Sequence, residues 1–336
     1  MARKKVVHID GDPNADWTLE REILATADAD LVVGGCKTDE EVVAVAADAD
    51  AILTTMYFMN RSLFEQLPRC QVVVRGGVGY DNLDVDAATD LGIFICNVID
   101  YGYHEVANHA FALLLALNRK LIQLDRGARA GAPRPERGAL KHVGRIHGQT
   151  LGLVAFGHIA REVAKRGQGF GMRVIAYDPY VDPAVAEAAG VELVELDELM
   201  RQSDFISVHA PLSAATRGLI GREQLALAKP NLYLAITSRG GVVDEEALAD
   251  ALREERIAGA GIDVWVHEPV RADDPLLAFD NVIATNHYAW YGDVSAAILR
   301  QRIPEAAADV LRGVKPRSIV NPEVLKVRPL ADRPPE

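Results

Sequence analysis

The stretch that decides the fold is LGLVAFGHIAREVAKRGQGFGMRVIAYDPY, residues 151–180. It contains an apolar strand, a turn with glycine, a helix and a second apolar strand, which is the βαβ pattern of a dinucleotide-binding fold. The usual GxGxxG fingerprint falls here on Ala155, Gly157 and Ala160. Glycine is kept at the middle position, where the backbone must approach a pyrophosphate, but alanine at the tight-turn position is unusual. Alone, this motif is a weak signal.

An acidic residue strengthens the motif. Asp178 stands at the end of the second strand, in register with the strand, turn and helix before it. A carboxylate at this place accepts hydrogen bonds from the adenosine ribose hydroxyls and repels a 2′-phosphate. A packing glycine and a strand-end aspartate are the alternative interpretation. The combination favours binding of NAD over NADP.

Strands and helices alternate on both sides of this unit. The predicted strands are Val6–Asp10, Leu31–Gly34, Ala51–Thr54, Val72–Arg75, Ile93–Asn97, Thr150–Phe156, Arg173–Asp178, Phe205–His209, Leu232–Thr237, Ala258–Asp263 and Val282–Thr285. Such alternation predicts parallel sheets. We therefore expect an α/β protein with two doubly wound parallel-sheet domains. The Arg-, Gly- and Pro-rich segment 126–149 is expected to be a loop-like linker.

Composition excludes several classes of function. A formal charge of −12 over 336 residues argues against non-specific binding to nucleic acid or to an anionic membrane surface. No run approaches the length of a transmembrane helix, and the start lacks the features of a signal peptide. The three cysteines, Cys36, Cys70 and Cys96, form neither a disulfide framework nor a zinc motif. A cytoplasmic protein with reduced thiols and no metal site is expected.

Six segments occur in the order found in one enzyme family, and together they span almost the whole chain. They are RGGVGYDNLDVDAATDLGIFICNV (75–98), TLGLVAFGHIAREVA (150–164), DFISVHAPLSAATRGLI (204–220), TSRGGVVDEEALADAL (237–252), AGAGIDVWVHEP (258–269) and NVIATNHYAWYGDVSAA (281–297). The chain thereby resembles the D-isomer-specific 2-hydroxyacid dehydrogenases. HYAWY (287–291) and VGRIHGQTLGL (143–153) most resemble the C-terminal-binding-protein branch, which contains NAD(H)-dependent corepressors as well as bacterial enzymes.

The resemblance implies a domain organisation. A Rossmann domain, residues 101–292, would be inserted into a flavodoxin-like substrate domain formed by residues 1–100 and 293–336. The active site would lie in the cleft between them, with NAD as cofactor and a small 2-oxo or 2-hydroxy acid as substrate. The family also implies a homodimer built through the inserted domain.

The family's catalytic residues fall on Arg239, Glu268 and His287. Reduction of a 2-oxo acid moves a hydride to the carbonyl carbon and a proton to its oxygen. His287 would supply the proton, because imidazole titrates near working pH. Glu268 would favour the imidazolium and orient its ring, and Arg239 would grip the carboxylate and polarise the carbonyl. Taken singly, these residues also fit a strand-end histidine, a solvated loop acid and a helix-entry ion pair.

Further site residues follow from the same resemblance. Candidate substrate contacts are Arg75, the backbone N–H groups of Gly76, Gly77 and Val78, and Trp290, for which core packing is the alternative. Candidate cofactor contacts are Ala155, Gly157, His158 and Ile159 in the fingerprint, Asp178 at the ribose, His209, Pro211 and Thr216 near the nicotinamide ribose, and Thr237 and Asp263 at the nicotinamide, where Asp263 would accept from the carboxamide.

Three more positions depart from the family pattern. Asn286 replaces the usual proline before the catalytic histidine, Ile236 replaces an asparagine, and Asn108 replaces an acid. Tyr288 and Tyr291 flank Trp290, which indicates a bulky, partly aromatic pocket rather than one for glyoxylate. Three hypotheses follow: a metabolic dehydrogenase, an NAD(H)-sensing corepressor-like binding protein, and an enzyme with different chemistry in the same cleft. The complete catalytic set favours the first.

Overall fold

The computed structural model describes residues 3–136 and 138–334. The chain forms two compact units, one built from Met1–Tyr101 with Gly292–Glu336 and the other from Gly102–Tyr291. The first unit is therefore discontinuous in sequence, because the chain leaves it after residue 101 and returns at residue 292.

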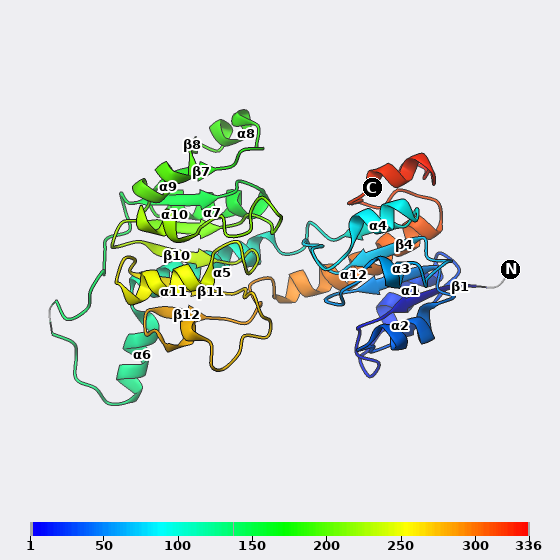
Figure 1. The fold of residues 1–336 in the computed structure, drawn as a ribbon, viewed down its shortest axis with the longest axis horizontal. Coiled ribbons are helices and arrows are strands. Elements are labelled where there is room, and N and C mark those ends of the chain that lie inside the picture. Colours follow the sequence, from blue (N-terminus) through cyan, green and yellow to red (C-terminus); the bar gives the residue numbers. More distant parts are fainter. Residues whose placement is uncertain (1–2, 137, 335–336) are drawn as a thin grey trace. The chain divides into compact units, whose positions relative to one another are not determined.

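The first unit contains a parallel sheet in the order β2-β1-β3-β4-β5. Figure 1 labels β1 and β4 in this unit. Its strands are β1 (Lys4–His8), β2 (Ala29–Val33), β3 (Ala51–Thr54), β4 (Val72–Arg75) and β5 (Phe94–Asn97). Every residue of β3, β4 and β5 is buried, as expected for parallel strands covered on both faces. The chain passes from β1 to β2 and then crosses to β3 on the other side of β1. The topological switch point therefore lies between β1 and β3.

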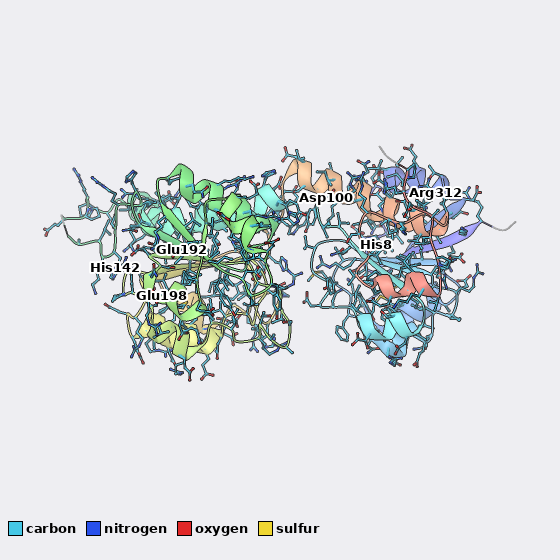
Figure 2. The ribbon with its side chains drawn as sticks, turned by 90° about the horizontal axis from the view of Figure 1, so that it is seen from above. His8, Asp100, His142, Glu192, Glu198 and Arg312 are labelled. Carbon is cyan, nitrogen blue, oxygen red and sulfur yellow. The ribbon has the colours of Figure 1, made fainter. Side chains whose placement is uncertain are left out.

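The last long helix completes this unit. The helices are α1 (Thr18–Ala25), α2 (Asp39–Ala46), α3 (Arg61–Phe64), α4 (Val85–Asp90), α12 (Asp293–Leu311) and the 3-10 helix η2 (Pro322–Lys326). Although α12 comes from the far end of the sequence, it packs against α1, β3 and β4. Arg300 of α12 pairs with the buried Glu20 of α1 at 2.7 Å. His8, at the end of β1, lies in this unit (Figure 2), where its side chain is buried.

The second unit contains a larger parallel sheet in the order β12-β11-β10-β9-β6-β7-β8. Its strands are β6 (Thr150–Val154), β7 (Arg173–Tyr177), β8 (Glu192–Leu193), β9 (Phe205–Val208), β10 (Tyr233–Ile236), β11 (Gly259–Ile262) and β12 (Val282–Ala284). Its switch point lies between β6 and β9, as in a Rossmann fold. The predicted fold class of two doubly wound parallel-sheet domains is confirmed.

Helices cover both faces of the second sheet. They are α5 (Tyr103–Asn118), α6 (Leu121–Arg129), α7 (His158–Gly169), α8 (Pro183–Ala188), α9 (Leu196–Gln202), α10 (Arg222–Ala226), α11 (Glu245–Arg253) and the 3-10 helix η1 (Pro275–Ala278). Successive strand residues enter different cores: Leu234 and Ile236 join one apolar cluster, while Tyr233 and Ala235 join the other. This alternation follows from the two-residue period of a strand.

Strand β8, the helices α6 and α8, and the two 3-10 helices were not predicted from the sequence pattern. Strand β8 has two residues, too few to show a period, and the short helix α8 directly follows a Pro-containing turn. Helix α6 continues to Arg129, so the predicted linker is wrong over residues 126–129. Its arginine and glycine residues indicated a loop, although they form the last turn of α6. Within the part of the chain that the structure describes, no helix is long and apolar enough to cross a membrane.

Candidate active site

The fingerprint turn joins β6 to α7, with Gly157 at the N-cap position. A methyl group placed on Gly157 would meet no described atom within 4 Å, so the backbone is open on that side. The amino terminus of α7, a helix of 12 residues, carries the partial positive charge that favours a pyrophosphate. His158 stacks on Tyr103 with 4.9 Å between ring centroids, and Ile159 packs against the core. This turn fits the diphosphate of a dinucleotide.

Ala155 takes the first fingerprint position in a left-handed conformation, with φ of 69°. That conformation costs a residue with a side chain about 1–2 kcal/mol, whereas the freedom of glycine in the unfolded chain costs about 0.5–1 kcal/mol. We expect Ala155→Gly to raise the free energy of unfolding by roughly 0.5–1 kcal/mol in urea denaturation. Ala188→Gly, at an exposed position of α8, should lower it instead. Equal losses in both variants would show that the Ala155 methyl group is worth more than the strain.

Asp178 holds the turn that follows β7. Its Oδ2 accepts from the Phe156 N–H at 2.8 Å, and its Oδ1 accepts from the N–H groups of Tyr180 and Val181 at 2.9 and 3.1 Å. A carboxylate has about four acceptor sites, so three bonds leave capacity for a ribose hydroxyl. The same side chain thereby links the fingerprint turn to the ribose position expected from the sequence.

Buried polar atoms without partners lie after β9 and β10. His209 Nε2, Thr237 Oγ1 and Ser238 Oγ find no hydrogen-bond partner among the described residues. Buried polar groups are almost always paired, so three such atoms at the carboxyl edge of one sheet indicate a ligand. The Thr216 hydroxyl donates to the Pro211 carbonyl and closes the turn beside them. The carboxamide and ribose of a nicotinamide nucleotide have the donors and acceptors that fit this edge.

Burial lowers the pKa of His209 to about 3. In the unfolded chain the same ring takes up a proton near pH 6.5. Because the folded-state pKa is depressed, stability falls as the pH drops through this range. Between pH 7 and pH 5, we expect His209→Gln to lose roughly 1–2 kcal/mol less unfolding free energy than the wild type. Equal losses in denaturant titrations would contradict a neutral His209.

Arg239, Glu268 and His287 follow β10, β11 and β12, which are neighbours in the sheet. Parallel strands end at the same edge, and the structure brings these side chains together there. His287 Nδ1 lies 2.6 Å from Glu268 Oε2, and the side chains are 26% and 21% exposed. Arg239 donates to the Ser238 carbonyl at 2.8 Å, and its charge acts on Glu268.

Opposing effects set the protonation of Glu268. Burial raises its pKa, but hydrogen bonds from His287 and from the Trp265 N–H, together with the charges of His287 and Arg239, outweigh burial and lower it. The carboxylate therefore stays ionised near neutral pH. An ionised Glu268 accepts from Nδ1 and leaves Nε2 of His287 for a substrate.

Asp263 lies beneath the turn that carries His287, which has φ of 55°. Its carbonyl accepts from the His287 N–H at 2.6 Å, and its carboxylate accepts from the N–H groups of Tyr288 and Ala289 and from the Thr285 hydroxyl. Asp263 has no exposed surface. Asp263 thus holds the His287 turn, and its contact with a nicotinamide carboxamide stays a prediction.

Trp265 is a site residue that the sequence analysis missed. Its N–H donates to Glu268 Oε1 at 3.0 Å, and its indole Nε1 donates to the Thr285 carbonyl at 2.9 Å. A methyl group on Gly240 would lie 2.1 Å from the Trp265 carbonyl carbon, so this glycine lets the Arg239 turn approach the same segment. Trp265 therefore connects the segments that carry all three catalytic candidates. From the sequence alone, a tryptophan before VHEP (266–269) indicates only a buried core residue.

We expect Trp265→Phe to lower kcat about 10- to 100-fold, because small misplacements of catalytic groups have effects of that size. The variant keeps an aromatic ring and loses the hydrogen bond to the Thr285 carbonyl. Trp17→Phe is the matched control, since the Trp17 indole donates to the Asp12 carbonyl at 2.8 Å in the other unit. Steady-state kinetics should show the loss in Trp265→Phe alone; equal losses would make the role of Trp265 purely structural.

Four of the predicted substrate contacts lie in the first unit, at the end of β4 and just after it. Arg75 is buried, and its Nη1 donates to the Gly76 carbonyl at 3.1 Å. The expectation that Gly76 and Gly77 offer their N–H groups to a substrate is wrong in this structure. Gly76 N–H donates to the Thr54 carbonyl, extending the β3–β4 ladder, and Gly77 N–H closes a tight turn onto the Arg75 carbonyl. Within the described chain, only Val78 of the three has no acceptor for its N–H.

Two of the departures from the family pattern, Asn108 and Ile236, have local explanations. Asn108 Oδ1 accepts from Arg166 Nε and Nη2 at 2.8 and 2.6 Å, so the amide oxygen serves as an acceptor for an arginine. Ile236 is buried in the core as the last residue of β10. Asn286 is exposed, and nothing in the structure explains its replacement of proline. Trp290 is half-buried, with its ring centroid 5.6 Å from that of Tyr291.

Comparisons with known proteins agree with this geometry. A family profile described as "D-isomer specific 2-hydroxyacid dehydrogenase, NAD binding domain" matches residues 111–289. A glyoxylate reductase of Korarchaeum cryptofilum is 39% identical over 84% of this chain and 86% of its own length. A D-3-phosphoglycerate dehydrogenase of Methanocaldococcus jannaschii is 39% identical over 84% of this chain, which spans 54% of that protein.

A solved structure gives the same result. The D-lactate dehydrogenase of Aquifex aeolicus, complexed with NAD and lactic acid, is similar with a TM-score of 0.82 and 27% identity, over 96% of this chain and 98% of that chain. The profile match covers the unit with the fingerprint turn and the paired His287 and Glu268. The chain therefore belongs to the D-isomer-specific 2-hydroxyacid dehydrogenase family.

Proposed function

We propose that this protein is an NAD-dependent dehydrogenase that interconverts a 2-oxo acid and a D-2-hydroxy acid, with His287 as general acid and base. The observation that carries the proposal is the pair of His287 and Glu268 at 2.6 Å, beside Arg239 at the carboxyl edge of a dinucleotide-binding sheet. The first unit acts as the substrate domain, with Arg75 and Val78 as its contacts.

The residues of this chain account for the proton and charge transfers. Bound NADH supplies the hydride. As the substrate carbonyl oxygen gains negative charge, the Nε2 proton of His287 moves to it. Glu268 stabilises the imidazolium that gives this proton, and Arg239 pairs with the substrate carboxylate and polarises the carbonyl. In the direction of oxidation, neutral His287 takes the hydroxyl proton.

The second unit would hold the cofactor along the carboxyl edge of its sheet. The turn at Ala155 and Gly157, with His158 at the start of α7, would hold the pyrophosphate. Asp178 would accept from the ribose and disfavour a 2′-phosphate, which selects NAD over NADP. His209 and Thr237 would provide their unpaired buried atoms to the nicotinamide end.

The first test is NADH oxidation by the purified protein with a panel of 2-oxo acids, with NADPH in parallel and NADH binding followed by fluorescence. Turnover with NADH and any member of the panel supports the proposal, and a much weaker rate with NADPH supports the role of Asp178. NADH binding without turnover of any 2-oxo acid would reject the dehydrogenase. That outcome would favour an NAD(H)-sensing binding protein or another reaction at the same site.

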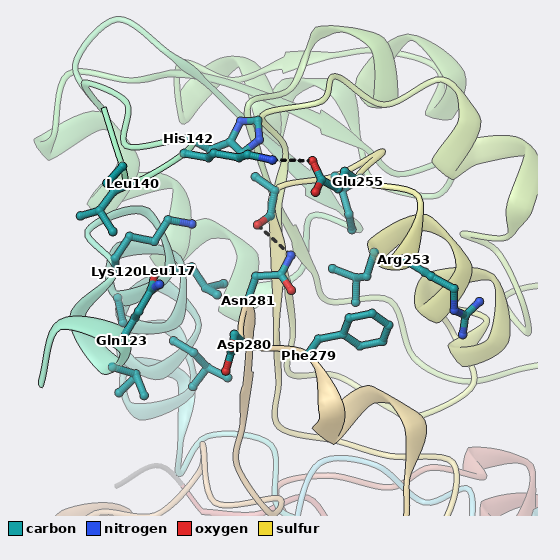
Figure 3. A pocket seen from close by; sticks show the side chains of 18 residues that line it. Leu117, Lys120, Gln123, Leu140, His142, Arg253, Glu255, Phe279, Asp280 and Asn281 are labelled. Atoms are coloured by element: carbon teal, nitrogen blue, oxygen red, sulfur yellow. Dashed lines mark hydrogen bonds and ion pairs between the residues drawn. The ribbon is translucent and has the colours of Figure 1, made fainter. Parts of the chain in front are cut away.

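We also propose a homodimer formed through the second unit. No residue of α6 is buried, and Leu121, Ile122 and Leu124 are exposed on it. Beside α6 lies a cavity of about 550 Å³, around which Leu117, Leu140 and Phe279 are arranged (Figure 3). Exposed apolar side chains on one helix, next to a cavity, are typical of a covered surface. Light scattering at micromolar concentration should give twice the chain mass; a monodisperse monomer would refute the dimer.

The cysteines support a reducing location. Cys36, Cys70 and Cys96 are free and buried, and burial raises the pKa of Cys70 to about 12. Thiols in this state suit the cytoplasm, which we propose as the site of action.

A further inference from the structure

A chain of hydrogen bonds leads from helix α5 to the turn that carries His287. The Nε2 atom of His109, in α5, lies 3.0 Å from the Thr285 hydroxyl oxygen, and that hydroxyl donates to Asp263 Oδ1 at 2.5 Å. His109 Nε2 itself lies 3.6 Å from Asp263 Oδ1. All of these residues belong to the second unit. The chain therefore joins a helix near the start of that unit to the segment near its end.

The Thr285 hydroxyl fixes the direction of this chain. A hydroxyl has one proton to donate, and the proton of Thr285 lies in its bond to Asp263. The hydroxyl oxygen must therefore accept from His109, so His109 Nε2 carries a hydrogen. An imidazole with a hydrogen on Nε2 makes this donation in its charged form and in one of its two neutral forms. His109 thus acts on Thr285 as a hydrogen-bond donor.

Close packing between α5 and the sheet brings His109 to this place. Helix α5 packs against β11 and β12. A methyl group on Gly261 of β11 would lie 2.7 Å from Leu113 Cβ, so glycine at this position lets the helix approach the strand. Leu113 follows His109 by four residues and lies on the same side of the helix. The same approach sets His109 beside Asp263, the residue that follows β11.

The chain ends on the carboxylate that holds the catalytic turn. Asp263 is buried, and it accepts from the N–H groups of Tyr288 and Ala289 at 2.9 and 3.0 Å. Hydrogen bonds in such a chain polarise one another, so a donor at its start strengthens the bonds that follow. Without the donor of His109, the Thr285 oxygen loses a partner and its hydroxyl is free to turn away from Asp263.

We propose that His109 is a positioning residue for His287, acting through Thr285 and Asp263. It orients the turn that carries the catalytic imidazole and takes no part in the proton transfer. The effect on turnover rests on the proposed dehydrogenase function, whereas the effect on the His287 ring does not depend on which reaction the protein catalyses.

The first experiment removes the donor and then restores it. His109→Phe keeps a ring in α5 but cannot donate to Thr285. It should lower kcat with the best 2-oxo acid about 10- to 100-fold, the effect of a slightly misplaced catalytic group. KM should stay close to that of the wild type, because the loss falls on the transition state and not on substrate binding. His109→Gln should recover most of the loss, since its amide nitrogen also donates.

A double-mutant cycle tests the path through Thr285. Thr285→Val keeps the shape of the side chain without its hydroxyl and should lower kcat about tenfold or more. Adding His109→Phe to it should cost little more, because residues in one hydrogen-bond chain are not additive. Tyr233→Phe is the matched control, since the Tyr233 hydroxyl donates to the His142 carbonyl at 2.7 Å from the start of β10. This control also loses one hydrogen bond in the second unit, and it should keep the wild-type kcat.

NMR spectra of the histidine rings separate this inference from the proposed function. The ring signals of His287, assigned by their absence in His287→Ala, should shift in His109→Phe and stay in place in Tyr233→Phe. If the wild type reduces no 2-oxo acid, the proposed function fails, but shifted His287 signals would still support the positioning role. Unchanged His287 signals in His109→Phe would overturn it. Equal losses of kcat in His109→Phe and His109→Gln, or additive losses in the double variant, would overturn it as well.

Discussion

His287→Ala should lower kcat with the best 2-oxo acid by at least about 10²–10⁴-fold, the usual contribution of a general acid. The variant removes the only group in the pair that can give a proton to the substrate oxygen, because ionised Glu268 accepts and does not donate. The dinucleotide residues lie on other strands, so NADH binding measured by fluorescence should stay close to that of the wild type. Stopped-flow NADH oxidation under single-turnover conditions would locate the loss in the chemical step.

A second histidine provides the control for this prediction. His147 is exposed in the segment before β6, and His147→Ala should keep the wild-type kcat. Unchanged turnover in His287→Ala would remove His287 from the mechanism. Loss of NADH binding in that variant would instead show that the turn from Thr285 to Ala289 has collapsed around Asp263.

Arg239→Ala should lower kcat/KM by about 10²–10³-fold, the effect of removing one group that stabilises charge in a transition state. Arg239 lies three residues after the end of β10, and its charge acts on Glu268. Both KM and kcat should change, because the guanidinium binds the substrate carboxylate and also stabilises the developing oxyanion. Arg239→Lys should recover only part of the loss, since an ammonium cannot form two parallel hydrogen bonds to a carboxylate.

Arg201→Ala is the matched control for the loss of a cation. Arg201 is half exposed on α9, and it pairs only loosely, with Asp197 at 3.7 Å and Glu198 at 3.9 Å. Its removal should leave kcat/KM unchanged. Full activity of Arg239→Ala would exclude this residue from substrate binding, and equal losses in both variants would point to an effect of net charge.

Most of the fold could be predicted because parallel strands buried on both faces have continuous apolar sequences. AILT at Ala51–Thr54 and VVVR at Val72–Arg75 are completely buried, and their lengths were predicted correctly. The two-residue β8 and the end of α6 were missed because neither is long enough, or apolar enough, to show a hydrophobic period. The strands that were predicted correctly are continuous apolar runs, whereas the missed elements are very short or polar.

The candidate active site could be predicted from the sequence only in part. The order of Arg239, Glu268 and His287 along the chain matched a family pattern, and sheet order then placed them at one edge. Asp263 was expected at the cofactor, but its depth beneath the His287 turn depends on a chain reversal that no local pattern shows. Trp265 was missed for the same reason, since its hydrogen bond to the Thr285 carbonyl spans 20 residues.

The sequence by itself determined the two doubly wound sheets, the fingerprint turn and the residue types that a proton and hydride transfer requires. These are properties of short stretches, in which apolar period, glycine position and side-chain chemistry are visible one residue after another. Only the tertiary structure decided which N–H groups remain available: Gly76 and Gly77 donate within the chain, and the oxygens of Asp10 and Asp263 hold loops. Hydrogen-bond capacity is shared between segments far apart in sequence, so it becomes known only when the sheet has brought those segments together.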